Sequence, residues 1–181
     1  MNILSRTGDQ IITLAEAKAN SRVTYSAEDD LFQIWIDLAS SKVEIETGLV
    51  FQQAICAQDV YGVEYVDLVA PVRGIVSVLD ADGEEVDYTY YKTSGYGCRI
   101  ELTTEREQVT IKYIAGFDEY TASTGETAIN EGDIDPYPVA KSAVLFLTNH
   151  YYENRGVVTD FEKHELPIGF NNLVSLIKKY R

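Results

Sequence analysis

Residues 26–48, SAEDDLFQIWIDLASSKVEIETG, decide the predicted fold, because a helical pattern ends here and a strand pattern follows. Ser26 is a candidate N-cap, and the acids Glu28, Asp29 and Asp30 suit the positive end of a helix dipole. Gly48 is a candidate stop. The apolar side holds five residues at helical spacing: Leu31, Ile34, Trp35, Leu38 and Ile45. The other face is polar: Asp37, Lys42, Glu44 and Glu46. The stretch therefore predicts an amphipathic helix of about six turns.

After Gly48 the chain changes to short stretches rich in Val, Ile, Tyr and Thr that partly alternate, as strands do. They are VYGVEYVDLV (60–69), GIVSVLD (74–80), EEVDYTYY (84–91), CRIELT (98–103) and EQVTIKYIAG (107–116). Asp82-Gly83 is a typical hairpin turn between two of them. We therefore expect a small antiparallel β module over 50–116, inserted between helices.

Further helices are predicted on both sides of this module. Thr13 and Glu16 have the spacing of a capping box, which predicts a short helix through ITLAEAKANS (12–21). Pro138 introduces a helix through VAKSAVLFLTNHYYENR (139–155), and LPIGFNNLVSLIKKYR (166–181) forms the last one. The resulting prediction is a single α+β domain, 1–181. Its helical core of four helices comprises 13–48 and 136–181, with the β module inserted.

Charge is distributed unevenly along the 181 residues. The net charge is −14, of which −5 falls in residues 26–48 and −11 in residues 49–134. The stretch 117–135, which ends one residue beyond the second block, carries six acids and no base, which predicts an exposed functional or partner-ordered loop. This acidity argues against ordinary nucleic-acid binding, which depends on Lys and Arg. No apolar run has the length of a transmembrane helix, and two cysteines favour a reducing compartment.

Motifs for chemistry are weak. Asp80, Asp82 and Gly83 resemble the start of a calcium loop, but the later ligands are missing, so a solvated hairpin is preferred. Glu131, Asp133 and Asp135 could hold a cation, although a charged loop is the preferred interpretation. Cys98 with His150 or His164 could form a nucleophile and base, but nothing in the sequence brings them together. We expect no enzyme, no bound metal and no cofactor.

The order of segments nevertheless resembles a family, the head–tail connector (adaptor) proteins of long-tailed double-stranded DNA bacteriophages. The opening ITLAEAKANSRVTYSAEDDLFQIWIDLASSKVEIETG is similar to that family's first two helices. APVRGIVSVLDADGEEVDYTYY resembles its proline-led strand and V-x-x-V-x-D-x-D-G hairpin, and VTIKYIAGF its strand ending in Tyr-x-Ala-Gly. DPYPVAKSAVLFLTNHYYENRG and LPIGFNNLVSLIKKYR resemble its proline-started and closing helices.

The resemblance implies a structural role. Such proteins form a homo-oligomeric ring, typically of twelve subunits, beneath the portal protein of the filled head, and carry a stopper or tail-completion protein. DNA passes through the ring without sequence-specific binding. The implied location is the head–tail junction of the virion, after assembly in the host cytoplasm and with no membrane involved. An acidic ring also avoids adhesion to phosphates, which agrees with the charge.

Two sets of residues are candidates for this role. The closing helix is expected to reach the portal or a neighbouring subunit through Leu173, Leu176, Ile177 and Tyr180, with Lys178, Lys179 and Arg181 beside them. The alternative is that this stripe packs on its own helices. Six acids are candidates for the channel wall: Glu28, Asp29, Asp30, Glu84, Glu85 and Asp87. The alternative is solvation of the ring exterior.

The sequence also agrees with two other functions. One is a small-ligand or glycan-binding accessory module, because a tyrosine-rich sheet offers flat amphipathic contact area. The other is a different tail-completion protein within the same structural class.

Overall fold

The computed structural model describes residues 1–68, 71–92, 97–117, 136–154 and 168–179. The chain divides into two compact units, each assembled from segments that are distant in sequence. The sheet unit takes its described residues from Met1–Asp9 and Gly48–Gly132, and the helical unit from Gln10–Thr47 and Asp133–Arg181. Residues 118–135, nearly all of the predicted acidic loop, lie outside the described residues.

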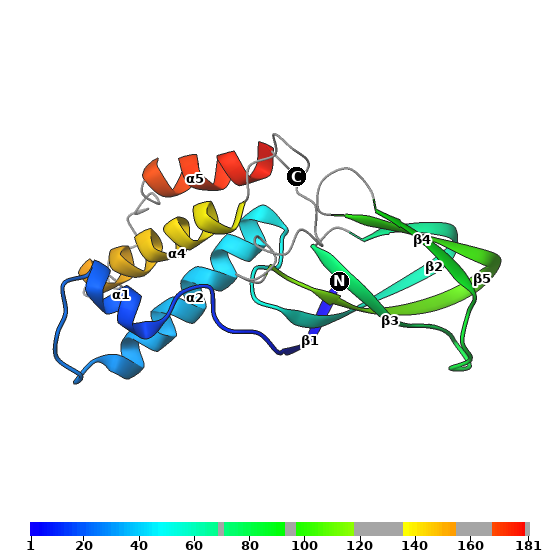
Figure 1. The fold of residues 1–181 in the computed structure, drawn as a ribbon, viewed down its shortest axis with the longest axis horizontal. Helices are drawn as coiled ribbons and strands as arrows, with labels where there is room; N and C mark the ends of the chain where they lie inside the picture. Colours follow the sequence, from blue (N-terminus) through cyan, green and yellow to red (C-terminus); the bar gives the residue numbers. More distant parts are fainter. Residues whose placement is uncertain (69–70, 93–96, 118–135, 155–167, 180–181) are drawn as a thin grey trace. The chain divides into compact units, whose positions relative to one another are not determined.

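The sheet unit is one antiparallel sheet of five strands that curls along its length (Figure 1). The strands are β1 (Asn2–Arg6), β2 (Ala54–Leu68), β3 (Val72–Asp80), β4 (Tyr88–Lys92) and β5 (Cys98–Ala115). Their order is β1-β2-β5-β3, and β4 also pairs with β5. β2 runs beside β5 from the Ala54–Ala115 pair to the Leu68–Cys98 pair. The other edge of β5 is shared, since β4 pairs with its first part and β3 with its last part.

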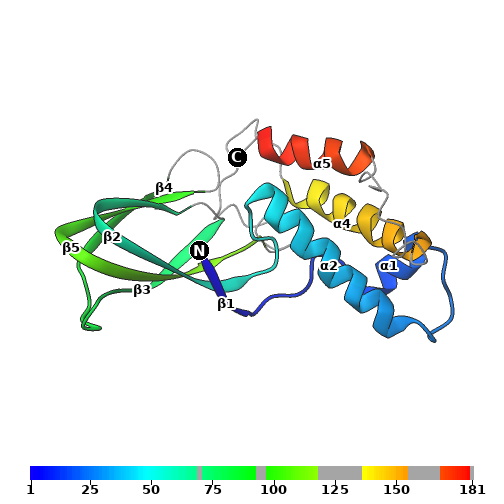
Figure 2. The same cartoon turned by 180° about the vertical axis from the view of Figure 1, so that it is seen from behind.

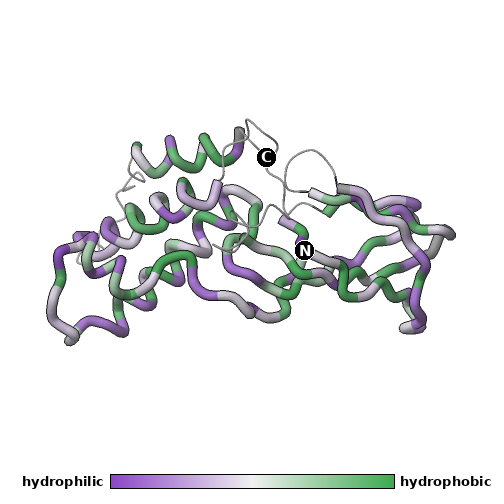
Figure 3. The backbone as a smooth tube through the Cα atoms, viewed as in Figure 1, coloured by the Kyte–Doolittle hydropathy of each residue, from purple (hydrophilic) through white to green (hydrophobic). Residues whose placement is uncertain are grey.

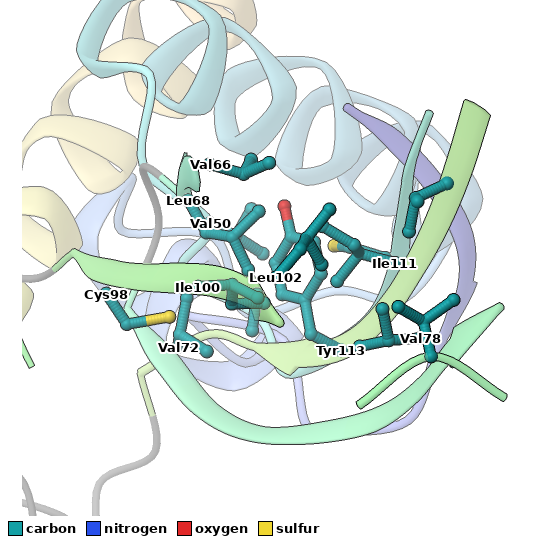
Figure 4. Packing of buried hydrophobic residues seen from close by; sticks show 14 of the residues in the cluster. Val50, Val66, Leu68, Val72, Val78, Cys98, Ile100, Leu102, Ile111 and Tyr113 are labelled. Atoms are coloured by element: carbon teal, nitrogen blue, oxygen red, sulfur yellow. The ribbon is translucent and has the colours of Figure 1, made fainter. Parts of the chain in front are cut away.

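One hydrophobic cluster forms the core of the sheet unit (Figure 4). Along β5 the buried residues are Cys98, Ile100 and Leu102, and then Val109, Ile111, Tyr113 and Ala115. The buried positions change from even to odd numbers between Leu102 and Val109, where the β2–β5 register shifts near Val63 and Tyr65. An irregularity of this kind reverses which side chains face the core beyond it.

A close approach of backbones joins the end of β5 to the segment before β2. A Cβ added to Gly116 would lie 2.6 Å from Gln53 Cα, and Gly116 has a φ of +124°. Thr7 N and Gly8 N both donate to Gln53 O, at 2.9 and 3.1 Å. Only glycine fits this position without backbone movement.

The helical unit contains α1 (Leu14–Asn20), α2 (Asp29–Thr47), α4 (Pro136–Glu153) and α5 (Ile168–Lys179). α4 contacts the other three helices, as the two opposite views of the fold illustrate (Figures 1 and 2). The capping box at α1 is confirmed: Thr13 Oγ1 accepts from Glu16 N, and Thr13 N donates to Glu16. α2 begins at Asp29, later than Ser26.

Each helix of this unit alternates between hydrophobic and hydrophilic residues along its length (Figure 3). The buried apolar residues of α2 are Phe32, Ile36, Ala39 and Val43. Those of α4 are Ala140, Ala143, Val144 and Leu147, and those of α5 are Phe170, Val174 and Ile177. The Phe32 ring stacks on Tyr152 with centroids 5.1 Å apart. Helices of this length are stabilised mainly by such packing.

The predicted fold class, a four-helix connector core with a small inserted β module, is wrong. The sheet has 15- and 18-residue strands, recruits β1 from the N-terminus and encloses its own core. The β module was underestimated because CRIELT and EQVTIKYIAG are parts of the single strand β5, whose alternation breaks at the polar residues between them. The sequence does not predict strand β1, because NILSR is short and its apolar and polar residues do not alternate; in the structure all five residues are exposed.

Candidate partner-binding surfaces

The outward face of α2 is apolar. Leu31, Ile34, Leu38 and Ile45, here called the α2 ridge, are 44%, 59%, 51% and 77% exposed. These residues are four of the five that the sequence placed on the apolar side of this helix. The packed side is instead the Phe32–Val43 set, so α2 has two apolar stripes and only one is buried. Such an exposed patch is typical of an interaction site.

The outward face of α4 carries a shallow groove of about 560 Å³. We call it the α4 groove; it is lined by Asn20, Ser142, Leu145, Phe146, Asn149, His150 and Glu153. Asn20 Nδ2 donates to Leu145 O at 3.3 Å, which ties the end of α1 to this face. Asn149 Nδ2 donates to Glu153 Oε1 at 3.0 Å. Neither the ridge nor the groove was predicted from the sequence as a site, because helical spacing alone does not show which of two stripes is covered.

The residues predicted as a contact on the closing helix, α5, differ in how far they are buried. Ile177 is buried, Leu173 is half-buried and Leu176 is 47% exposed. Lys178 Nζ lies 3.3 Å from Glu46 of α2, so its charge is already paired within the helical unit. Tyr180, Arg181 and the side chain of Lys179 lie outside the described residues. Part of the predicted stripe therefore packs on its own helices, and among its described members Leu176 has an outward apolar side chain.

The predicted channel acids form two sets with different surroundings. In the first set, Asp29 pairs with Lys18 at 2.5 Å, and Glu28 accepts from the Tyr25 hydroxyl at 2.9 Å. The hydrogen bond with the Tyr152 hydroxyl and the one donated to Glu28 raise the pKa of Tyr25 to about 12. Asp30 is exposed.

The second set, Glu84, Glu85 and Asp87, follows the turn after β3, where all three residues are exposed. The Asp82-Gly83 turn is confirmed: Asp80 Oδ1 accepts from Asp82 N and Glu84 N, and Gly83 has a φ of +85°. Val86 between the acids is buried, so it anchors a segment whose charges face outward.

Exposed tyrosines also lie on the sheet, as the ligand-binding alternative requires. The Arg99 guanidinium lies 4.9 Å from the centre of the Tyr65 ring and forms a two-point ion pair with Asp67, at 2.7 and 2.8 Å. The Arg99 guanidinium holds the pKa of the Asp67 carboxyl below its ordinary value. The charges of this arrangement are paired with each other.

The structure brings no catalytic constellation together among the residues that it describes. Cys98 is buried in the sheet core, where burial raises the pKa of its thiol to about 11, so the thiol is protonated at neutral pH. His150 contacts Asn154, the residue directly after α4, and His164 lies outside the described residues. Within the described ranges, no three His, Cys, Asp or Glu side chains are grouped as a metal site, and no helix is long and apolar enough to cross a membrane.

Neither the protein-family models nor the curated proteins include a match to this chain. Among solved structures, a chain of the native gene transfer agent (GTA) virion is similar, with a TM-score of 0.66 and 20% identity. The match covers 99% of this chain and 94% of that one. Chains from GTA necks computed with C6 and C12 symmetry match with TM-scores of 0.62 and 0.57, at 21% and 18% identity. They cover 98% and 97% of this chain, and 94% and 96% of theirs. Both units of this chain therefore have a fold that occurs in GTA particles.

Proposed function

We propose that this chain is a structural virion protein of the neck, which assembles as a ring of identical copies at the head–tail junction and lets DNA pass. The observation that carries the proposal is the likeness over almost the whole of both chains to GTA virion and neck proteins, two of them from necks with C6 and C12 symmetry. A fold shared over a single unit would support much less, since common folds host many functions.

The proposed ring has twelve subunits, and it joins the portal protein to a stopper or tail-completion protein after assembly in the host cytoplasm. Twelve agrees with the C12 neck and is compatible with the C6 one, because a twelve-fold ring contains six-fold symmetry. The net charge of −14 suits a protein that surrounds DNA without binding it. The role is structural and requires no catalysis.

Electron microscopy of particles that contain this protein tests the proposal. We expect a ring at the neck whose subunit density fits both units of this fold, with about one copy per portal subunit. A tagged chain that is absent from purified particles, or that stays monomeric and never binds portal assemblies, would contradict the proposal.

For the portal contact, the observation that matters is the exposed Leu176 on α5. We propose that Leu176 reaches the portal or a neighbouring subunit. Deletion of α5 cannot test this, because the helix contributes Phe170, Val174 and Ile177 to the core. Leu176→Asp alters the proposed contact and leaves the core residues of α5 in place. Ser175→Asp is the control, because it adds the same charge at the neighbouring exposed position of α5. Equal docking of the two variants on portal assemblies would contradict this contact.

A further inference from the structure

The helical unit presents two unlike surfaces on opposite sides of one packed helix pair. α2 and α4 contact each other, and each buries one apolar face within the unit. With 3.6 residues per turn, the α2 ridge lies about half a turn from the buried residues of α2, and the α4 groove about half a turn from those of α4. The ridge and the groove of one copy therefore face away from each other and cannot meet within that copy.

The two surfaces match in shape and length. Leu31 to Ile45 spans fourteen residues, or about 21 Å of helix, and Ser142 to Glu153 spans eleven, or about 17 Å. The ridge is a row of branched apolar side chains, and the groove offers Leu145 and Phe146, which is 45% exposed, as its apolar wall. That ring is supported from behind, because a Cβ on Gly169 of α5 would lie 3.2 Å from it.

The polar residues around the two surfaces are also complementary. Asp30 and Asp37 are exposed beside the ridge, and Asp37 Oδ1 already accepts from Gln10 Nε2 at 2.6 Å, so Asp30 is the carboxylate with the more open surroundings. In the groove, Asn20 Nδ2 donates to Leu145 O and Asn149 Nδ2 to Glu153, which leaves each amide a second N–H for a carboxylate of the neighbouring copy. The exposed Arg22 follows two residues after Asn20.

We propose that the α2 ridge of one copy packs into the α4 groove of the next copy, and that this head-to-tail contact links the subunits of the ring. The inference deepens the proposed function and rests on it for closure into a ring. Two different surfaces on opposite sides of a subunit generate a heterologous contact, which gives a closed ring when the rotation per subunit closes. A surface that packed on its own copy would stop at a dimer.

The expected strength of this single contact is low. A ridge about 21 Å long and about 10 Å wide covers about 200 Å², against about 800 Å² per partner in a standard stable interface. The free protein is therefore expected to associate only in the millimolar range, and closure on a portal adds the effective concentration that a chain of weak contacts needs. The ridge can thus remain exposed on a free subunit without driving aggregation.

Cysteine cross-linking at about 1 mM protein tests the contact, because weak complexes are populated at that concentration. The full chain carries Leu38→Cys on the ridge, Asn149→Cys in the groove, or both, and is treated with a short bis-maleimide. The native Cys56 and Cys98 are buried, so the wild-type chain serves as the background. The matched control is Ser175→Cys with Asn149→Cys, since Ser175 is exposed on α5, outside the ridge. Circular dichroism confirms folding of each variant.

A head-to-tail contact gives a ladder of covalent dimers, trimers and larger species for the Leu38→Cys/Asn149→Cys chain. A mixture of the two single variants then gives only the unlike dimer. Dimers from Leu38→Cys alone, or a ladder no stronger than that of the Ser175→Cys control, would overturn the contact. If the ladder is absent while microscopy still shows the protein as a neck ring, the inference fails and the proposed function stands. If the ladder forms but no particle contains the protein, the contact between copies stands and the proposed neck function fails.

Discussion

Ile34 and Ile36 lie two residues apart on α2 and point to opposite sides, one 59% exposed and the other fully buried. The same residue type therefore serves two surfaces of one helix. Ile36 belongs to the core that α2 shares with the other helices of its unit, and Ile34 belongs to the α2 ridge. The pair offers a direct comparison of folding and assembly with one chemical change.

We expect Ile36→Ala to lower the free energy of unfolding of the helical unit by about 2–5 kcal/mol, because it leaves a cavity in a packed core. Ile34→Ala is expected to change it by less than about 0.5 kcal/mol. Trp35 is the single tryptophan of the chain and lies on α2, so denaturant unfolding followed by its fluorescence reports on this unit. Equal losses for the two variants would contradict the assignment of the two faces.

The sequence did not predict which of the two apolar faces of α2 is buried. Helical spacing predicted α2, and the Thr13–Glu16 spacing predicted the start of α1, because these patterns depend on neighbouring residues alone. The buried face depends on which stripe meets α4, more than 100 residues later. The same holds for the sheet: strand types were predictable from Val, Ile and Tyr content, whereas the union of two stretches into β5 depends on its partners β2, β3 and β4.

Gly116 is expected to tolerate no side chain. Gly116→Ala places a Cβ within 3 Å of the Gln53 backbone at a φ that L residues rarely adopt, so it should cost about 2 kcal/mol or more. Gly74→Ala is the matched control in the same sheet. Its added Cβ meets nothing within 4 Å of it in the described chain, and the expected change is under about 1 kcal/mol. Thermal unfolding by circular dichroism compares the two variants, and similar melting temperatures would refute the close approach.

Tyr113 is fully buried in the sheet core, and its hydroxyl has no hydrogen-bond partner among the described residues (Figure 4). Burial, with Cys56 and Cys98 nearby, raises the pKa of this phenol well above its ordinary value. Tyr113→Phe keeps the ring and removes the buried polar group, so we expect stability to stay constant or rise by about 1 kcal/mol. Tyr113→Ala should cost about 3–5 kcal/mol through the cavity. A clear loss in denaturant unfolding of Tyr113→Phe would show that the hydroxyl contributes to stability.

Glu16 links α1 to α4 and predicts a dependence on pH. The hydrogen bond from Lys141, at 2.7 Å, and the bond from Thr13 N lower the pKa of the Glu16 carboxyl from 4.5. Because the folded-state pKa of Glu16 lies below its unfolded value of about 4.5, the charged carboxyl stabilises the folded state above about pH 4.5. This stability is lost as the pH falls through the folded-state pKa. The side chain is 40% exposed, so the contribution is expected to be under about 1 kcal/mol.

Glu16→Gln keeps an acceptor for Thr13 and removes the charge, so it should lower the melting temperature at pH 7, and this difference should shrink as the pH falls through the folded-state pKa of Glu16. Lys141→Gln should show the same pattern, and the double variant should lose no more than Glu16→Gln alone. A difference from wild type that does not shrink toward acid pH would rule out the ion pair as its source.

The last prediction concerns the acids proposed to face the DNA passage. Lysines at Glu84, Glu85 and Asp87 reverse the charge of an exposed turn and leave the buried Val86 in place, so the sheet should fold and rings should form. If this turn lies at the channel wall, phosphates are attracted where they were repelled, and DNA ejection from assembled particles should slow. Screening limits this effect to charges within about 8 Å of the DNA at physiological salt, so an exterior turn should have no effect. The neutral variant Glu84→Gln/Glu85→Gln/Asp87→Asn removes the repulsion of the phosphates without adding attraction, so it separates the two effects. The corresponding change at Glu28, Asp29 and Asp30 is a poorer test, because Asp29→Lys places a cation beside Lys18 and destabilises the packing of α1 against α2.

The outcome for the Glu84→Lys/Glu85→Lys/Asp87→Lys variant decides where this turn lies. If rings of this variant eject DNA at the wild-type rate, the three charges lie on the ring exterior, where their role is solvation.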